Sequence, residues 1–418
     1  MNRRIIALGS SIWRAAGLLA AVLSVSACVA PAPSPVPSLP SPVVSALPAP
    51  TASSSPTPTG ASIPTLTPGL DAWAIYAAAW QGCPHQTTAP VVIPAAVEVP
   101  QDLIPVGDCA ILFYGTSGNL WIATPAGLAK FPQSPLRADA TTGYVAAILA
   151  AGPDGVWVAD KTTPYRPTLT LVRPDSVVAV RLPPRTIDIG GIADTASGVL
   201  VATDVGDISD ATSDVGSPGT DVLSVSSDGN VTLLWSAHDL SARAIAVDGT
   251  TTVLAAGPPN RPGFSIIAND GHGWARTEAT QDPLWVTGLA ASGHQIVVLS
   301  ERLTPHDVAD TVVTSASQDG GGTWANHETP TDASPVALLG FHAGIALAQN
   351  MLGSSPEGLA QLSATGDWIP YPAIPAQQTD WSGRTVALAQ CGVWVLDTLP
   401  APGIDRLMTH VLLPGPGC

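Results

Sequence analysis

The stretch Gly155-Val156-Trp157-Val158-Ala159-Asp160, GVWVAD, sets the theme of the chain: a turn residue followed by a short run of β-branched, aromatic and small apolar residues. Glycine permits a tight turn, and a run of this kind favours a strand. Such runs start at residues 118, 155, 198, 252, 294, 344 and 392, at intervals of 37 to 54 residues. The other six are Gly118–Thr124, Gly198–Thr203, Thr252–Ala256, His294–Leu299, Gly344–Gln349 and Gly392–Asp397.

A period of this length is that of a four-stranded unit repeated along the chain. The repeat predicts an all-β fold, a β-propeller, with seven blades from the number of runs. Six or eight blades remain possible because the first and last units are incomplete. We assign residues 108–418 to the propeller and residues 69–107 to a short helix and a lead-in strand that pack on it. The segment Pro90–Val106 could supply the missing outer strand beside Leu407–Leu413, so that the two chain ends would close the ring.

The octet Ser317–Trp324, SQDGGGTW, fits this repeat as a turn between two strands. The pattern Ser-x-Asp-x-Gly-x-Thr-Trp resembles the Asp-box, or BNR repeat, which in sialidase-like propellers joins the third and fourth strands of a blade. The resemblance gives a structural role to Ser317, Asp319, Gly321, Thr323 and Trp324. Degenerate relatives of the octet are Ser226–Thr232, Ala268–Trp274 and Ser363–Trp368. The stretch Asn119–Phe131, NLWIATPAGLAKF, is also similar to the repeat of sensor-type propellers.

Sialidase-like enzymes would need an arginine triad, an Asp acid/base and a Tyr nucleophile paired with Glu. Arg181-Leu182-Pro183 matches the motif that supplies the first arginine, but it falls in the second or third blade, later than the family pattern. Spacing does not assemble the remaining arginines and Tyr165 or Tyr371 into such a site. We therefore name no catalytic residue, and we keep a sialidase-like glycoside hydrolase as the alternative function.

The first residues read as a targeting segment. Arg3 and Arg4 precede an apolar run that is too short to span a bilayer, and the run ends in Val25-Ser26-Ala27-Cys28. This ending resembles the bacterial lipobox, in which the cysteine is lipidated and becomes the new N-terminus. We expect residues 1–27 to be a lipoprotein signal peptide and Cys28 the lipid anchor; the alternative is an ordinary secretory signal with an incidental cysteine. Residues 28–68 are rich in Pro, Ser and Ala and predict an extended tether.

The remaining cysteines suit an oxidising compartment. Setting Cys28 aside leaves an even number, which allows three pairings that the sequence does not decide between. They lie near the two ends of the predicted propeller, and they lack the spacing of a zinc site. The disulfide candidates are Cys83, Cys109, Cys391 and Cys418.

The formal net charge of −16 argues against nucleic acid as a partner, because phosphates would be repelled. One acidic stretch could bind calcium outside the cytoplasm through hard oxygen ligands, although its spacing is not that of an EF-hand. Its residues are Asp204, Asp207, Asp210 and Asp214. No other cofactor is expected.

The sequence as a whole predicts a lipoprotein held on the extracytoplasmic side of the bacterial envelope membrane by its lipid anchor. Its propeller would bind a protein or carbohydrate partner, or support assembly of an envelope complex, without catalysis. Propellers suit this role because loops from every blade meet on one face.

Overall fold

The computed structural model describes one helix and the strands that follow it. The described residues are 70–81, 91–93, 100–107, 109–124, 127–139, 143, 145–206, 219–249, 251–259, 261–278, 284–303, 309–330, 335–341, 344–349, 359–362, 368–370, 384–389, 392–397 and 406–412. The predicted signal peptide, Cys28 and the proline-rich segment up to residue 68 lie outside them. None of the helical segments described is long and apolar enough to cross a membrane.

The strands of the described residues pair into seven four-stranded antiparallel sheets. Five of them follow in chain order with most side chains described. They are β2 (Gln101–Val106), β3 (Ala110–Tyr114), β4 (Leu120–Thr124), β5 (Gly127–Lys130); β6 (Ala147–Gly152), β7 (Gly155–Asp160), β8 (Thr168–Val172), β9 (Val177–Val180); β10 (Thr186–Thr195), β11 (Gly198–Val205), β12 (Gly219–Ser226), β13 (Val231–His238); β14 (Ser241–Asp248), β15 (Thr251–Gly257), β16 (Ser265–Asn269), β17 (Trp274–Glu278); and β18 (Leu284–Ser292), β19 (Gln295–Leu303), β20 (Ala309–Ser317), β21 (Ala325–Pro330).

The two further sheets are described mainly by their backbone. One comprises β22 (Pro335–Phe341), β23 (Gly344–Gln349), β24 (Leu359–Leu362) and β25 (Trp368–Pro370). The other has the order β1-β28-β27-β26, from β1 (Val91–Ile93), β26 (Arg384–Ala389), β27 (Gly392–Asp397) and β28 (Arg406–Leu412).

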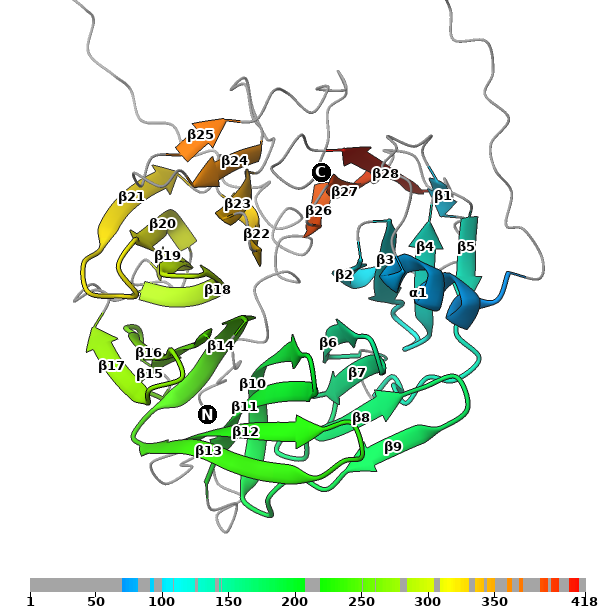
Figure 1. Ribbon diagram of the computed structural model, residues 1–418, viewed down its shortest axis with the longest axis horizontal. Coiled ribbons are helices and arrows are strands. Elements are labelled where there is room, and N and C mark those ends of the chain that lie inside the picture. The colour runs from blue at the N-terminus through cyan, green and yellow to red at the C-terminus, as the bar shows by residue number, and fades with distance from the viewer. Residues whose placement is uncertain are drawn as a thin grey trace, which may run out of the picture. The chain divides into compact units, whose positions relative to one another are not determined.

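The sheets follow one another around a central axis, as blades of a β-propeller do (Figure 1). The first strand of each sheet contacts the first strand of the next, and β26 contacts β2, so the series closes. In the last sheet β1 pairs with β28, with Val91 opposite Met408. Val91–Ile93, within the segment Pro90–Val106, therefore lies beside the C-terminal strand as predicted. Gln101–Val106 of the same segment is instead the first strand of the first sheet.

The apolar runs of the repeat form strands, as predicted. Six of the seven are the second strand of their sheet, GVWVAD being β7. The run at Gly118 differs: Leu120–Thr124 is the third strand of its sheet, and the second is Ala110–Tyr114. The reason is a second glycine turn, in which Gly118 has φ 86°, placed before another apolar strand.

Apolar residues of adjacent sheets pack together and form the core. One cluster joins Trp157 of β7, buried almost completely, to Ile189 of β10 and Val201 of β11. Another joins Leu254 of β15 to Leu200 and Val222 of the preceding sheet. The β10–β13 sheet therefore buries one face against the preceding sheet and the other against the following sheet, which explains its near-continuous apolar inner strands.

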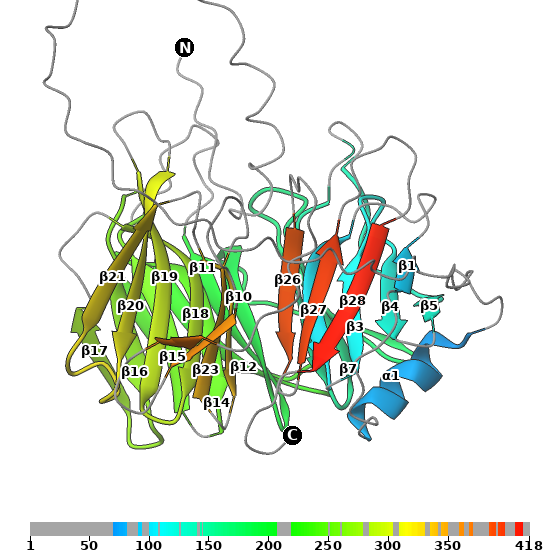
Figure 2. The same ribbon diagram turned by 90° about the horizontal axis from the view of Figure 1, so that it is seen from above.

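The predicted helix is α1, Ala72–Trp80. Asp71 caps it by accepting a hydrogen bond from the Trp73 backbone N–H at 2.9 Å. The Tyr76 hydroxyl lies 2.7 Å from the Gly152 carbonyl oxygen, to which it donates in the turn between β6 and β7. Trp73 packs edge-on against Phe131, with ring centroids 4.7 Å apart. The helix lies beside β3 and β4 at one end of these strands (Figure 2).

Candidate functional site

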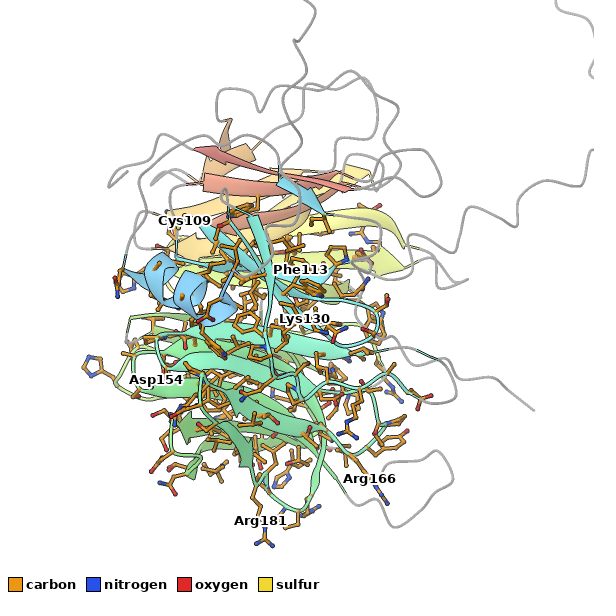
Figure 3. The ribbon with its side chains drawn as sticks, turned by 90° about the vertical axis from the view of Figure 1, so that its right-hand side faces the viewer. Cys109, Phe113, Lys130, Asp154, Arg166 and Arg181 are labelled. Atoms are coloured by element: carbon orange, nitrogen blue, oxygen red, sulfur yellow. The ribbon has the colours of Figure 1, made fainter. Side chains whose placement is uncertain are left out.

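Each sheet has two ends, and the candidate site lies at one of them. We call the end where the first strand begins and the second strand finishes the upper face, and the opposite end the lower face. Figure 3 places Arg166, in the β7–β8 loop, and Asp154, in the β6–β7 turn, at opposite ends of their sheet. The candidate site on the upper face consists of Lys161, Asp188, Asp204, Arg243 and Trp285.

β-Bulges interrupt the first strands close to where they begin. In β14 the residues Ala242 and Ala244 pair with the consecutive residues Ala256 and Ala255, so Arg243 is the extra residue of a bulge. Similar register shifts occur near the start of β10 and β18. A bulge re-aims side chains and is common beside binding sites. At Arg243 it places a basic side chain on the upper face.

Asp204, near the end of β11, joins two blades. Its Oδ2 atom accepts a hydrogen bond from the Ser241 hydroxyl at 2.5 Å, and Oδ1 accepts one from the Ala242 backbone N–H at 2.6 Å. Only 9% of the residue is exposed. Burial raises the pKa of its carboxyl group to about 6, against the lowering effect of these hydrogen bonds. Both oxygens therefore hold the start of β14 in place.

Of the four predicted calcium ligands, only Asp204 lies in the part of the chain that is described, so calcium binding stays a prediction. No group of three or more metal-binding side chains occurs among the described residues. Asp204 is engaged between blades, and Asp207, Asp210 and Asp214 lie outside the described residues.

Asp188 and Asp204 form a cross-strand pair between β10 and β11. Like charges placed directly opposite repel each other, and Asp188 contributes to the raised pKa of Asp204. Lys161, from the preceding sheet, offsets this charge: its Nζ atom lies 3.1 Å from Asp188 Oδ1. The Asp188 side chain is 47% exposed, so this carboxylate is accessible from solvent.

Arg243 and Trp285 form the aromatic part of the site. The Arg243 guanidinium carbon lies 4.7 Å from the centroid of the Trp285 ring, a cation–π distance. One Nη atom of Arg243 donates to the Pro258 carbonyl oxygen at 3.1 Å. Burial lowers the pKa of Arg243, and Asp204 and Asp188 oppose that shift. The Arg243 guanidinium is therefore held in place over the Trp285 ring, which is partly exposed to solvent.

A second, partly buried carboxylate joins neighbouring first strands. Asp102 of β2 accepts a hydrogen bond from the Leu149 backbone N–H of β6 at 2.8 Å. Its φ angle is 49°, in the left-handed region. Burial raises its pKa to about 6. Like Asp204, Asp102 thus connects two adjacent blades through a hydrogen bond to the backbone of the next sheet.

The octet lies on the lower face, in the turn between β20 and β21, the third and fourth strands of their sheet. Asp319 Oδ1 accepts a hydrogen bond from the Thr323 backbone N–H at 2.8 Å, and its Oδ2 accepts one from the Thr323 hydroxyl at 2.8 Å. These bonds lower the pKa of Asp319 to about 2. The Ser317 hydroxyl oxygen accepts from the Gly321 N–H at 2.8 Å. Trp324 donates from Nε1 to the Gly321 carbonyl oxygen at 3.0 Å.

This geometry explains the residue types of the octet. Gly321 has φ 98°, a conformation that favours glycine, and its N–H and C=O are both used within the turn. Trp324 also packs against a buried cluster that includes Ile296 and Val313. Two predicted relatives lie between the third and fourth strands of their own sheets as well, Ser226–Thr232 between β12 and β13 and Ala268–Trp274 between β16 and β17. Most of the third, Ser363–Trp368, lies outside the described residues. The octet and these two turns are therefore remote from the upper-face site.

The residues considered for sialidase chemistry do not converge among those described. Arg181 follows the outermost strand β9 and is exposed, while Arg276 lies on another outermost strand, β17. Tyr165 is exposed in the β7–β8 loop, and Tyr371 lies outside the described residues. Arg181-Leu182-Pro183, which match the sialidase motif, thus lie at the end of an edge strand.

Cys109 lies in the turn between β2 and β3 and takes part in a disulfide bond. The other candidates, Cys83, Cys391 and Cys418, lie outside the described residues, so the pairing stays a prediction.

Sequence reasoning did not single out Lys161, Asp188 or Trp285. These three residues share only their position in the repeat, since each lies where a second strand ends or a first strand begins. This shared position can be recognised only when the order of strands within each sheet is known.

The comparisons with known proteins concern the fold. No family model matches the chain, and no curated protein matches its sequence. A structure of YCF48 bound to D1 peptide is similar at 8% identity, over 78% of this chain and 96% of that one, with a TM-score of 0.46. The Dos1 propeller is similar at 11% identity, over 78% and 94% of the two chains, with a TM-score of 0.44. An ancestral GH74 enzyme is similar at 13% identity, over 77% of this chain and 48% of that one, with a TM-score of 0.45.

Proposed function

We propose that this chain is a lipoprotein of the bacterial envelope whose propeller binds a protein partner on its upper face without catalysis. The proposal includes a closed ring of seven blades, lipidation at Cys28 and a proline-rich tether that holds the ring away from the membrane. The pairing of β1 with β28 supports the closed ring, since it joins the two ends of the folded region in one sheet. The lipobox-like sequence supports the anchor.

One observation carries the binding role: the carboxylate best placed for chemistry is used to hold blades together, whereas basic and aromatic side chains remain partly exposed. Asp204 is buried with both oxygens occupied, so it is not available to a substrate. Arg243 stacked on Trp285 is a combination typical of the residues that dominate protein interfaces.

The cross-strand pair of Asp188 and Asp204 favours glycoside hydrolysis as a second candidate function. Such enzymes use two carboxyl groups whose environments separate their pKa values. Here Asp204 has a raised pKa, and Asp188 is paired with Lys161. The burial of Asp204 argues against this role, because the general acid must reach the glycosidic oxygen.

The test compares capture of a partner with turnover. Full-length protein carrying Trp285→Ala is cross-linked chemically in the native envelope and compared with the wild type. Leu233→Ala, on the exposed outermost strand β13, is the matched control. We expect a defined cross-linked species that Trp285→Ala removes and Leu233→Ala retains. Release of sugar from a glycoside panel that Asp204→Asn abolishes would refute the proposal and favour hydrolysis.

A further inference from the structure

Two neighbouring loops carry four basic side chains on the upper face of the β6–β9 sheet. They are the segments 161–167 and 181–185. They lie at the same end of the sheet because Asp160 pairs with Thr168 across β7 and β8, and Leu169 pairs with Val180 across β8 and β9. We call Lys161, Arg166, Arg181 and Arg185 the basic patch.

Both loops are held in shape. Proline contributes four of their residues, Pro164, Pro167, Pro183 and Pro184, each of which fixes its own φ angle. Backbone hydrogen bonds add to this restriction. The Arg166 N–H donates to the Thr163 carbonyl oxygen at 3.2 Å, and the Gly206 N–H donates to the Arg185 carbonyl oxygen at 2.9 Å. A partner would therefore meet loops whose backbone is already ordered, which lowers the entropy cost of binding.

The three arginines of the patch are exposed at the surface. Among the described residues, the side chains of Arg166, Arg181 and Arg185 make no hydrogen bond or ion pair, while Lys161 is paired with Asp188. Figure 3 shows Arg166 and Arg181 projecting away from the sheet. Tyr165, the residue before Arg166 in the first loop, is 41% exposed and has a φ angle of 59°. Guanidinium groups next to an exposed tyrosine have the composition of an interface centre.

We propose that the basic patch binds a short acidic segment of the protein partner. The proposal rests on the function proposed above and names the partner's chemistry. A guanidinium group donates two parallel hydrogen bonds to a carboxylate, which suits Asp and Glu side chains. The formal charge of the chain is −16, so the patch is a local exception. A long polyanion or an anionic bilayer would face the acidic remainder of the chain as well. A short segment stays within the Debye length of ~10 Å around the patch and is attracted.

The test measures binding of a fluorescein-labelled oligoglutamate peptide to the full-length protein in detergent, with oligoglutamine as the uncharged control. The triple variant Arg166→Ser/Arg181→Ser/Arg185→Ser removes the exposed cations of the patch. The triple variant Lys130→Ser/Arg261→Ser/Arg276→Ser removes the same charge from exposed positions in other sheets. The three contacts together should contribute about tenfold in affinity, as exposed charge pairs of ordinary strength do.

We expect oligoglutamate to bind, oligoglutamine not to bind, and added salt to weaken the complex. The patch variant should lose about tenfold in affinity and the control variant less than twofold. Equal losses in both variants would overturn the proposal, because net charge and not the patch would then attract the peptide. Binding to phosphatidylglycerol vesicles in place of the peptide would overturn it in favour of a lipid surface. If oligoglutamate fails to bind while Trp285→Ala still removes the cross-linked species, the patch proposal falls and the proposed function stands.

Discussion

Replacing Asp204 by Asn should make the propeller more stable at alkaline pH and leave it unchanged at acidic pH. The folded state holds the pKa of Asp204 at about 6, above the ordinary value of 3.8. A group whose pKa is raised by folding stabilises the protein fully below its unfolded pKa, and this contribution is lost as the pH rises through the folded pKa. A difference of about two units corresponds to about 3 kcal/mol at pH 8.

Asparagine at position 204 can keep both hydrogen bonds, to Ser241 and to Ala242. Its Oδ1 atom can accept from the Ala242 N–H, and its amide can donate to Ser241, whose hydroxyl also serves as an acceptor. The variant therefore removes the buried charge and keeps the contacts. Asp204→Ala is the control: it leaves the Ala242 N–H without its acceptor and should be less stable than Asp204→Asn by about 1–3 kcal/mol at every pH.

The assay is urea unfolding followed by tryptophan fluorescence at several values between pH 4 and pH 8. The difference between Asp204→Asn and the wild type should grow from near zero at pH 4 to about 3 kcal/mol at pH 8. Parallel stability curves across this range would refute the reasoning, since they would show that Asp204 does not carry a raised pKa in the folded state.

Three further predictions concern the turn, the anchor and calcium. Asp319→Ala should lower the melting temperature measured by calorimetry, because Thr323 loses both hydrogen bonds, whereas partner cross-linking on the upper face should persist. Cys28→Ser should abolish incorporation of labelled palmitate and release the protein from membranes; retention would contradict the lipid anchor. If Asp207, Asp210 and Asp214 bind calcium, millimolar calcium should raise the melting temperature, and their joint replacement by Asn should remove the effect; no shift in the wild type would exclude that site.

The repeat made the fold predictable because each blade depends on local signals. A glycine turn followed by an apolar run specifies a strand wherever it occurs, as in Gly155–Asp160 and Gly392–Asp397. Local signals also led to one error: Leu120–Thr124 was aligned with the second strands of other sheets, but it is a third strand, because two successive strands there carry the same pattern. Pairing of Val91–Ile93 with the C-terminal strand was also predictable, since an incomplete last unit needs a fourth strand.

The site was less predictable because its contacts join residues that are far apart in sequence. Asp204 reaches Ser241 only after a register shift in β14 and the packing of adjacent sheets, and neither leaves a local pattern. The acidic stretch that begins at Asp204 suggested metal binding by composition alone. Arg181 was singled out by a three-residue motif. Such a motif does not show whether the strand beside it is an inner strand or, as here, the outermost strand of its sheet.

The central claim, that the upper face binds a protein partner, is tested most directly by site-specific photo-cross-linking in the native envelope. A photoreactive phenylalanine derivative is placed at Tyr165 on the upper face and, in a second protein, at Asp270 in the lower-face turn between β16 and β17. Both positions are exposed, so they differ in location and not in access. We expect a discrete cross-linked product from position 165 and none from position 270. A product from position 270 alone would contradict it.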